Sequence, residues 1–460
     1  MPGYAVRTIP RTSDKRAARD RRTIAVVQTR RLLLRRSAVT TFLAVVCLLV
    51  AAAAAVSCQA PAPRRSAGQP VAHQHHEEAA PPPSAADAAL QLQVLLGHHS
   101  ILAAELMRGR LRGDDAYTKA AAAAAEKNTQ AMASLVDSLF GPAAAAQFTE
   151  LWSGHITALA DYAGGLAKHD AAARDGATAR LETFERTLAA FFAGASKGRL
   201  SQQAAQAAVL MHVQHLLQQA DAYAAHDYPA ADRIDRQGYT HSYAMGKTLV
   251  AALVTPAQAA ALDSPVWVLR SELSRLLGEH VVLVVSAMRA GLTNGPDFAA
   301  AAQSVNDNTR ELTAAVGSMF GAPAAARFQS LWADHIDQIF AYTTGLVTHN
   351  AQRREAAVTR LGTFEAQFAA FLDQATADRL PSTTLAKALL MHDQMLLAQA
   401  DALSAKQYQQ ANDGTYATYR HMTDLAGQLA QAFGATVASR LPVGGPHTGY
   451  GGAAASVEHG

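Results

Sequence analysis

The sequence predicts an all-α protein: a tandem duplication of a roughly six-helix unit, each copy a helix bundle built from antiparallel helical hairpins. Three observations predict this fold class. Alanine, the strongest helix former, is abundant. Apolar residues recur at the spacing of a helix face. The second half of the chain repeats the first at a fixed offset. Runs of valine and isoleucine typical of strands are scarce.

Residues 1–57 have the organisation of a lipoprotein signal peptide. A basic stretch ends at Arg36, and the apolar segment 37–56 leads to Ser57 and Cys58. This order resembles the bacterial lipoprotein signal, although Ala55 stands where leucine is usual. The resemblance implies that Cys58 becomes the lipidated N-terminus. We therefore expect a protein anchored by lipid to the cell membrane, on its extracytoplasmic face. The alternative is an uncleaved anchor helix, since about 20 apolar residues can span a bilayer.

Residues 58–86 are rich in proline, alanine and serine, which predicts a disordered linker. The linker contains the run His-Gln-His-His-Glu-Glu from His73 onward. Such a run can hold divalent copper, nickel or zinc loosely, or it can be a solvated polar segment. Residues 441–460, after the second copy, are expected to form a disordered tail.

Charge, cysteine usage and motifs exclude several classes of function. Eleven Lys/Arg and two Asp fall within residues 1–36, so the remainder of a chain with net charge +3 is mildly acidic, which argues against nucleic-acid binding. Both cysteines, Cys47 and Cys58, precede the globular part, which therefore has no disulfide, thiolate metal site or cysteine nucleophile. We find no phosphate loop, zincin motif or nucleophile elbow. The Glu-x-x-His motif of di-iron bundles is also missing. The sequence therefore favours a protein that is not an enzyme.

The duplication defines two helical repeat domains, at 87–255 and 266–440. Leu-Leu-Gly-His-His from Leu95 returns as Leu-Leu-Gly-Glu-His from Leu276, and from Asn128 onward the offset is a constant 180. Within each copy a weaker period of about 56 residues indicates three helical hairpins. The first helix of every hairpin carries a histidine at an equivalent place: His99, His155 and His212 in the first copy, and His280, His335 and His392 in the second.

These histidines fall near mid-helix on apolar faces. His155, for example, shares a helical stripe with Leu151, Tyr162 and Leu166. The equivalent position of the second helix holds asparagine, phenylalanine and histidine in the three hairpins: Asn128, Phe184 and His241, repeated as Asn308, Phe364 and His421. If the hairpins pack together, the polar members of each copy form one buried layer.

Such a layer must be satisfied by hydrogen bonds, water or a metal, because an unpartnered buried polar group costs about 1–3 kcal/mol. Three interpretations stay open. The first is a structural network that fixes helix register. The second is a metal or haem site, because imidazole ligates copper, zinc, nickel and iron. The third is an organic-ligand pocket lined by Trp152, Tyr162, Tyr223 and Tyr239. The candidate metal ligands are His99, His155, His212, His241, His280, His335, His392 and His421.

The repeated motifs resemble exported helical modules of other bacteria. The resemblance covers residues 90–253 and 271–433, and it is carried by Leu-Leu-Gly-His-His, Leu-Trp-x-x-His, Met-His and Tyr-x-His. The family has no established activity, and some members are described as copper amine oxidase-like. That description implies a tyrosine-derived quinone within Asn-Tyr-Asp/Glu. The tripeptide is absent from this sequence, so the enzyme is not carried over.

The sequence thus predicts an extracytoplasmic lipoprotein with a binding or structural role, and copper or haem as the first ligands to test. The predicted partner is the membrane, reached through the N-terminal lipid, with no nucleic acid and no protein partner specified. Two alternatives are kept. One is a periplasmic or cell-surface redox enzyme that uses such a metal, and the other is a purely structural envelope protein.

Overall fold

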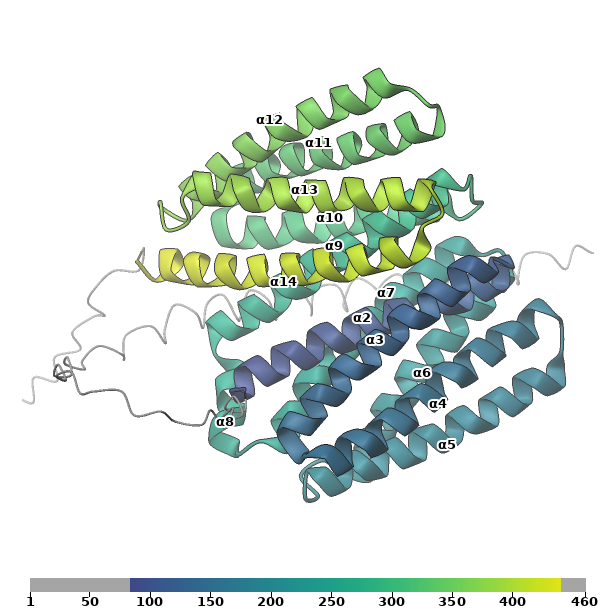
Figure 1. The fold of residues 1–460 in the computed structure, drawn as a ribbon. Coiled ribbons are helices and arrows are strands. Elements are labelled where there is room, and N and C mark those ends of the chain that lie inside the picture. The colour runs from purple at the N-terminus through teal and green to yellow at the C-terminus, as the bar shows by residue number, and fades with distance from the viewer. Residues whose placement is uncertain (1–82, 440–460) are drawn as a thin grey trace, which may run out of the picture. The chain divides into compact units, whose positions relative to one another are not determined.

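The structure is a computed structural model that describes residues 83–439 (Figure 1). Within this range the chain forms helices joined by short turns, without a strand. The predicted all-α fold class is therefore confirmed. The predicted signal peptide, Cys58, most of the linker and the tail lie outside the described residues.

Each copy contributes three antiparallel helical hairpins, as the repeat period predicts. The first copy consists of α2 (Ala85–Arg112), α3 (Asp115–Phe140), α4 (Pro142–Ala167), α5 (Ala171–Ala195), α6 (Gln202–Ala224) and α7 (Tyr228–Leu253). The second consists of α9 (Pro265–Leu292), α10 (Phe298–Phe320), α11 (Ala322–Val347), α12 (Ala351–Ala375), α13 (Ser382–Ser404) and α14 (Tyr408–Ser439).

Short polar side chains set where the second helix of each hairpin begins. Asp114, Asp170 and Asp227 are N-caps, and each carboxylate accepts a hydrogen bond from the amide three residues later. Asn350 does the same for α12. In the first hairpin of the second copy the turn is longer, and α10 begins only at Phe298. This matches the extra residue that the sequence places there.

The six helices of a copy close into a bundle around the first helices of the three hairpins. In the first copy α2, α4 and α6 contact one another, and α3, α5 and α7 pack outside them. The same arrangement recurs around α9, α11 and α13. Large side chains such as Trp152, Leu159 and Leu181 fill the first bundle and are almost completely buried. Side chains at the centre of a bundle therefore come from the helices that carry the six equivalent histidines.

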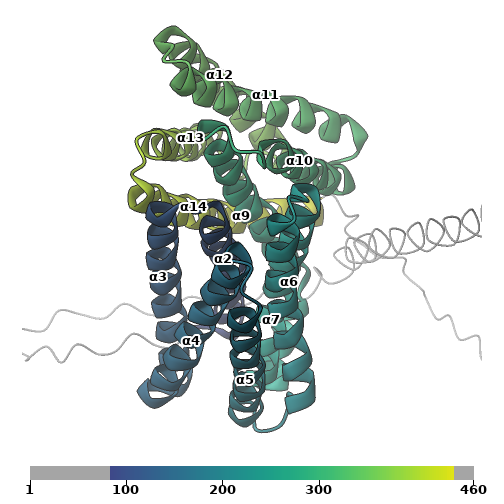
Figure 2. The same cartoon turned by 90° about the vertical axis from the view of Figure 1, so that its right-hand side faces the viewer.

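The two copies contact each other through α2 and α9, α3 and α14, and α7 and α10 (Figure 2). Tyr239 and Tyr419 occupy equivalent positions, and their hydroxyl oxygens lie 2.9 Å apart. Equivalent residues contact each other only where they lie at a two-fold axis. The two copies are therefore related by a pseudo-two-fold axis. Gly97 and Gly278, also equivalent, lie against these tyrosine rings.

The break between the copies holds a short helix, α8 (Pro256–Ala260), followed by a 3-10 turn at Ala261–Asp263. Thr255 and Gln258 form a capping box that starts α8. None of the helices among residues 83–439 combines the length and the apolar character needed to cross a membrane.

We expect Gly278→Ala to destabilise the protein by about 1–3 kcal/mol, because an added Cβ would lie 2.7 Å from the Tyr419 ring and 3.1 Å from the Tyr239 hydroxyl. The matched control is Gly362→Ala on α12, where an added Cβ meets nothing within 4 Å. That change should stabilise the helix by up to about 1 kcal/mol. Urea unfolding measures both. A Gly278→Ala protein as stable as the parent would show that the helices are not held this close.

Candidate metal centres

Three histidines meet at the centre of the first bundle. His99 comes from α2, His155 from α4 and His212 from α6, and each offers a ring nitrogen that lies within 4.8 Å of the other two. Their ring centroids are 5.2, 5.3 and 5.6 Å apart. We call these residues the first triad.

The second bundle repeats the arrangement. His280 on α9, His335 on α11 and His392 on α13 again bring ring nitrogens within 4.8 Å of one another. Their ring centroids are 5.6–5.7 Å apart. This second triad stands where the duplication places it, so both copies use their three inner helices in the same way.

Both triads are buried and receive few hydrogen bonds from the protein. All six side chains are at most 1 % exposed. Nine buried ring nitrogens lack both a partner in good hydrogen-bond geometry and an ion-pair contact: His99 Nε2, His155 Nδ1 and Nε2, His212 Nε2, His280 Nδ1 and Nε2, His335 Nε2, and His392 Nδ1 and Nε2. The His155 ring has a weaker interaction with the backbone of Trp152. Native interiors rarely leave buried polar atoms unpartnered, since each such atom costs about 1–3 kcal/mol. A ligand shared by the three rings would remove much of this cost.

Burial keeps the histidines neutral. It lowers the pKa of His155 and of His335 to about 3. Burial, and then the neighbouring imidazoles, hold the pKa values of His99, His212 and His392 well below the ordinary range. A neutral imidazole keeps a lone pair on one nitrogen, and it is this form that binds metals.

Aromatic side chains hold the triad rings in place. Phe184 stacks on His155 at 4.3 Å between centroids, and Phe364 stacks on His335 at 4.7 Å. Trp152 lies beside His99 at 4.7 Å between centroids, and its Nε1 donates to His99 Nδ1 over 3.3 Å. In the second copy Trp332 occupies the same place beside His280, at 4.8 Å.

One further ring of each triad has a polar neighbour besides the tryptophan, and the two neighbours differ. His212 Nδ1 lies 3.2 Å from the hydroxyl of Ser242. His335 Nδ1 lies 3.3 Å from Asp393 Oδ1, an ion-pair distance without good hydrogen-bond geometry. Burial and then the nearby Glu365 carboxyl raise the pKa of Asp393 well above its usual range. Each neighbour leaves Nε2 of its histidine available.

His241 and His421 lie outside the triads. Each is half-buried, and its Nε2 lies 2.9 Å from a backbone carbonyl, that of Ala208 or Ala388. Of the eight histidines predicted as metal ligands, the structure therefore brings together six, in two groups of three. The asparagines at the equivalent positions of the first hairpins also contact backbone carbonyls, through their amide nitrogens. Asn128 donates to Leu95 O and Asn308 to Leu276 O, and Asn308 also donates to Glu279.

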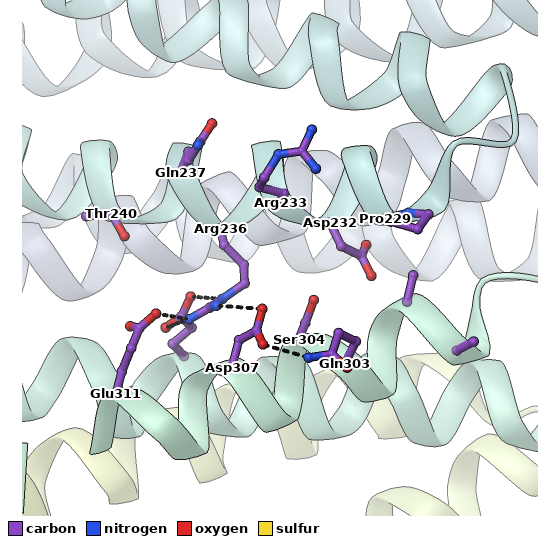
Figure 3. Close-up of a pocket in the computed structure, with 13 residues that line it drawn as sticks. Pro229, Asp232, Arg233, Arg236, Gln237, Thr240, Gln303, Ser304, Asp307 and Glu311 are labelled. Carbon is purple, nitrogen blue, oxygen red and sulfur yellow. Dashed lines mark hydrogen bonds and ion pairs between the residues drawn. The ribbon is translucent and has the colours of Figure 1, made fainter. Parts of the chain in front are cut away.

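A charged groove of about 500 Å³ lies between α7 and α10 (Figure 3). Its principal charges are already paired, because Arg236 donates to both Glu279 and Glu311. At the equivalent place on the other side of the pseudo-two-fold, His98 stacks on Tyr416 at 5.4 Å. Glu279 is the residue equivalent to His98, and the two differ because each contacts a different side chain of the other copy. We therefore assign the groove to the contact between the copies.

Sequence reasoning missed Ser242 and Asp393. Asp393 follows His392 directly, and Val213 is its equivalent in the first copy, so the broken repeat was the available signal. Ser242 likewise corresponds to Met422. Neither difference indicates a site until the distances to the triad rings are known.

The fold and the sites together define a duplicated all-α bundle protein with one buried three-histidine cluster in each copy. No known protein family, curated protein or solved structure matches the chain.

We expect His155 to contribute a loss of stability to the metal-free protein that sets in as the pH drops below about 6.5. Unfolding lets His155 take up a proton at its ordinary pKa of 6.5, whereas in the folded bundle its pKa is about 3. Between these values each such histidine costs about 1.4 kcal/mol per pH unit. Urea unfolding at pH 7.5, 6.5, 5.5 and 4.5 measures the slope. His155→Phe should reduce it by roughly that amount, and an unchanged slope would contradict a neutral buried ring.

Proposed function

We propose that the protein is a membrane-anchored, extracytoplasmic metal-binding protein that holds one metal ion in each histidine triad. The anchoring follows from the lipoprotein-like leader and from Cys58. The single observation that carries the metal is the convergence of three buried imidazoles, with ring nitrogens that lack other partners, in both copies.

The donor set suits copper or zinc. Imidazole nitrogens bind these ions at about 2.0–2.1 Å, so three nitrogens on one ion lie roughly 3.5 Å apart. Nitrogens within 4.8 Å of one another reach that spacing by small rotations of the rings. Protein sites with three ligands keep a further position open when the metal is catalytic. No described group identifies a substrate, so we propose binding and not a reaction.

The spacing of the rings favours a single ion over haem. The three rings of the first triad lie 5.2–5.6 Å apart and are flanked by Trp152 and Phe184. A porphyrin is wider than this space and would have to separate the inner helices. A purely structural network is the remaining alternative. The many unpartnered nitrogens count against it, because a structural network is stable when its members satisfy one another.

We expect two bound copper or zinc ions per chain. The protein for this test comprises residues 59–460, which include every described residue, with His73, His75 and His76 changed to alanine so that the linker contributes no ligand. Metal content after dialysis gives the stoichiometry. Copper should also quench the fluorescence of Trp152 and Trp332, which lie against the triads.

His155→Phe and His335→Phe should each remove one ion and leave the other, because phenylalanine keeps the aromatic packing but offers no ligand. The matched controls are His169→Asn and His349→Asn. These equivalent exposed histidines sit at helix ends with φ near +50°, a conformation that asparagine tolerates. The controls should keep both ions. A protein that stays metal-free, with a melting temperature indifferent to copper and zinc, would leave the structural network as the function.

A further inference from the structure

The two triads have the same three ligands, but an acidic side chain lies beside only the second. In the second copy Asp393, 2 % exposed, lies 3.3 Å from His335 Nδ1. Its equivalent in the first copy is Val213, an apolar side chain that is also buried. The duplication therefore provides an internal comparison. Ser242 and Met422 also differ between the copies, but only the exchange of Val213 for Asp393 introduces an acidic group.

The first triad has no acidic side chain among its described contacts. Trp152, Phe184 and Ser242 carry no charge. The other titratable groups that act on it, His98, His215 and His241, are imidazoles and add no negative charge. Glu185 is the equivalent of Glu365, but its electrostatic partners are Glu182 and Arg186 on its own helix. In the second copy the corresponding glutamate, Glu365, interacts with Asp393 and so belongs to the acidic side of that triad.

We propose that the two triads bind ions of different charge. The first triad is a binding site for a monovalent ion, Cu(I), and the second for a divalent ion such as Zn(II) or Co(II). Asp393 is the residue that causes the difference. This inference rests on the proposed metal binding and names the class of ion at each site.

The physical reason is the cost of burying charge. The solvation energy lost when an ion enters a dry interior rises with the square of its charge, so a divalent ion needs compensation far more than a monovalent one. Three neutral imidazoles supply none. Cu(I) is a d10 ion that accepts three-coordinate imidazole sites without a further donor. The first triad therefore suits Cu(I).

Asp393 provides compensation in the second triad without being a ligand. Burial disfavours the charged form of Asp393 in the metal-free protein, whereas a divalent ion on the His335 ring, 3.3 Å away, favours it. The carboxylate formed as the ion binds and the proton leaves would orient the ring so that Nε2 faces the ion, increase the basicity of that nitrogen and place negative charge near the metal. Carboxylate–histidine–metal arrangements of this kind typically change metal affinity 10–100-fold when the carboxylate is removed. Asp393 is thus a positioning and charge-setting residue.

The test measures each site alone. His335→Phe leaves only the first triad and His155→Phe only the second, both in the linker-substituted chain of residues 59–460. Co(II) binding is followed by visible absorption. Cu(I) binding is followed anaerobically by competition with a chromophoric chelator. We expect the second triad to bind Co(II) at least roughly tenfold more tightly than the first, and the first to show the higher ratio of Cu(I) to Co(II) affinity.

Substitutions of Asp393 and of its equivalent, Val213, test whether this position causes the difference in ion affinity. Asp393→Asn keeps the size and an acceptor oxygen but removes the charge, and it should weaken Co(II) binding by about 10–100-fold while leaving Cu(I) binding nearly unchanged. Val213→Asp should raise the Co(II) affinity of the first triad. Circular dichroism checks folding, and Asp393→Asn suffices if Val213→Asp does not fold. A purely structural role would weaken both ions equally.

The outcomes separate this inference from the proposed function. Equal Co(II) affinities in the two single-site proteins, or an Asp393→Asn protein that binds Co(II) as the parent does, would overturn the specialisation while metal binding stands. Failure of both single-site proteins to bind either ion would overturn both.

Discussion

The structure depends on one constraint: three imidazoles from three different helices must face each other inside an apolar bundle. Their rings meet only while α2, α4 and α6 keep a fixed register along the bundle. A slip of one turn, 5.4 Å, would separate nitrogens that now lie within 4.8 Å. The same rings are poorly satisfied by the protein, so the core is most stable when something else satisfies them. Fold and site are therefore set by the same side chains.

Much of the fold could be predicted because its determinants are local or repeated. Helical periodicity, capping aspartates such as Asp114 and Asp170, and the constant offset of 180 gave the hairpins and their duplication. Periodicity also gave the depth of each histidine. It could not give the neighbour that each ring would meet. His241 has the depth and the apolar stripe of a core ligand, yet its Nε2 faces the carbonyl of Ala208 because it comes from an outer helix.

The features that required the structure depend on how helices are rotated and how the copies pack. The Tyr239–Tyr419 contact joins residues 180 positions apart, and nothing in either repeat alone indicates that they meet. The role of Asp393 is similar. The difference from Val213 is visible in the sequence, but its meaning depends on a 3.3 Å distance to a ring on another helix. The sequence pattern predicts which face of a helix a residue lies on and how far along the bundle it sits. The distances between side chains of different helices follow from tertiary packing.

The pseudo-two-fold contact has a consequence for how the two halves can diverge. In a dimer of separate identical chains, every substitution occurs twice, and pairing weakens when the protein is dilute. Here α8 and its flanking turns tether the halves, so their association is intramolecular and independent of the amount of protein. Each half is then free to change by itself. Covalent fusion thus turns a symmetric scaffold into one on which two unlike histidine clusters can evolve while the halves keep their shared contact surface.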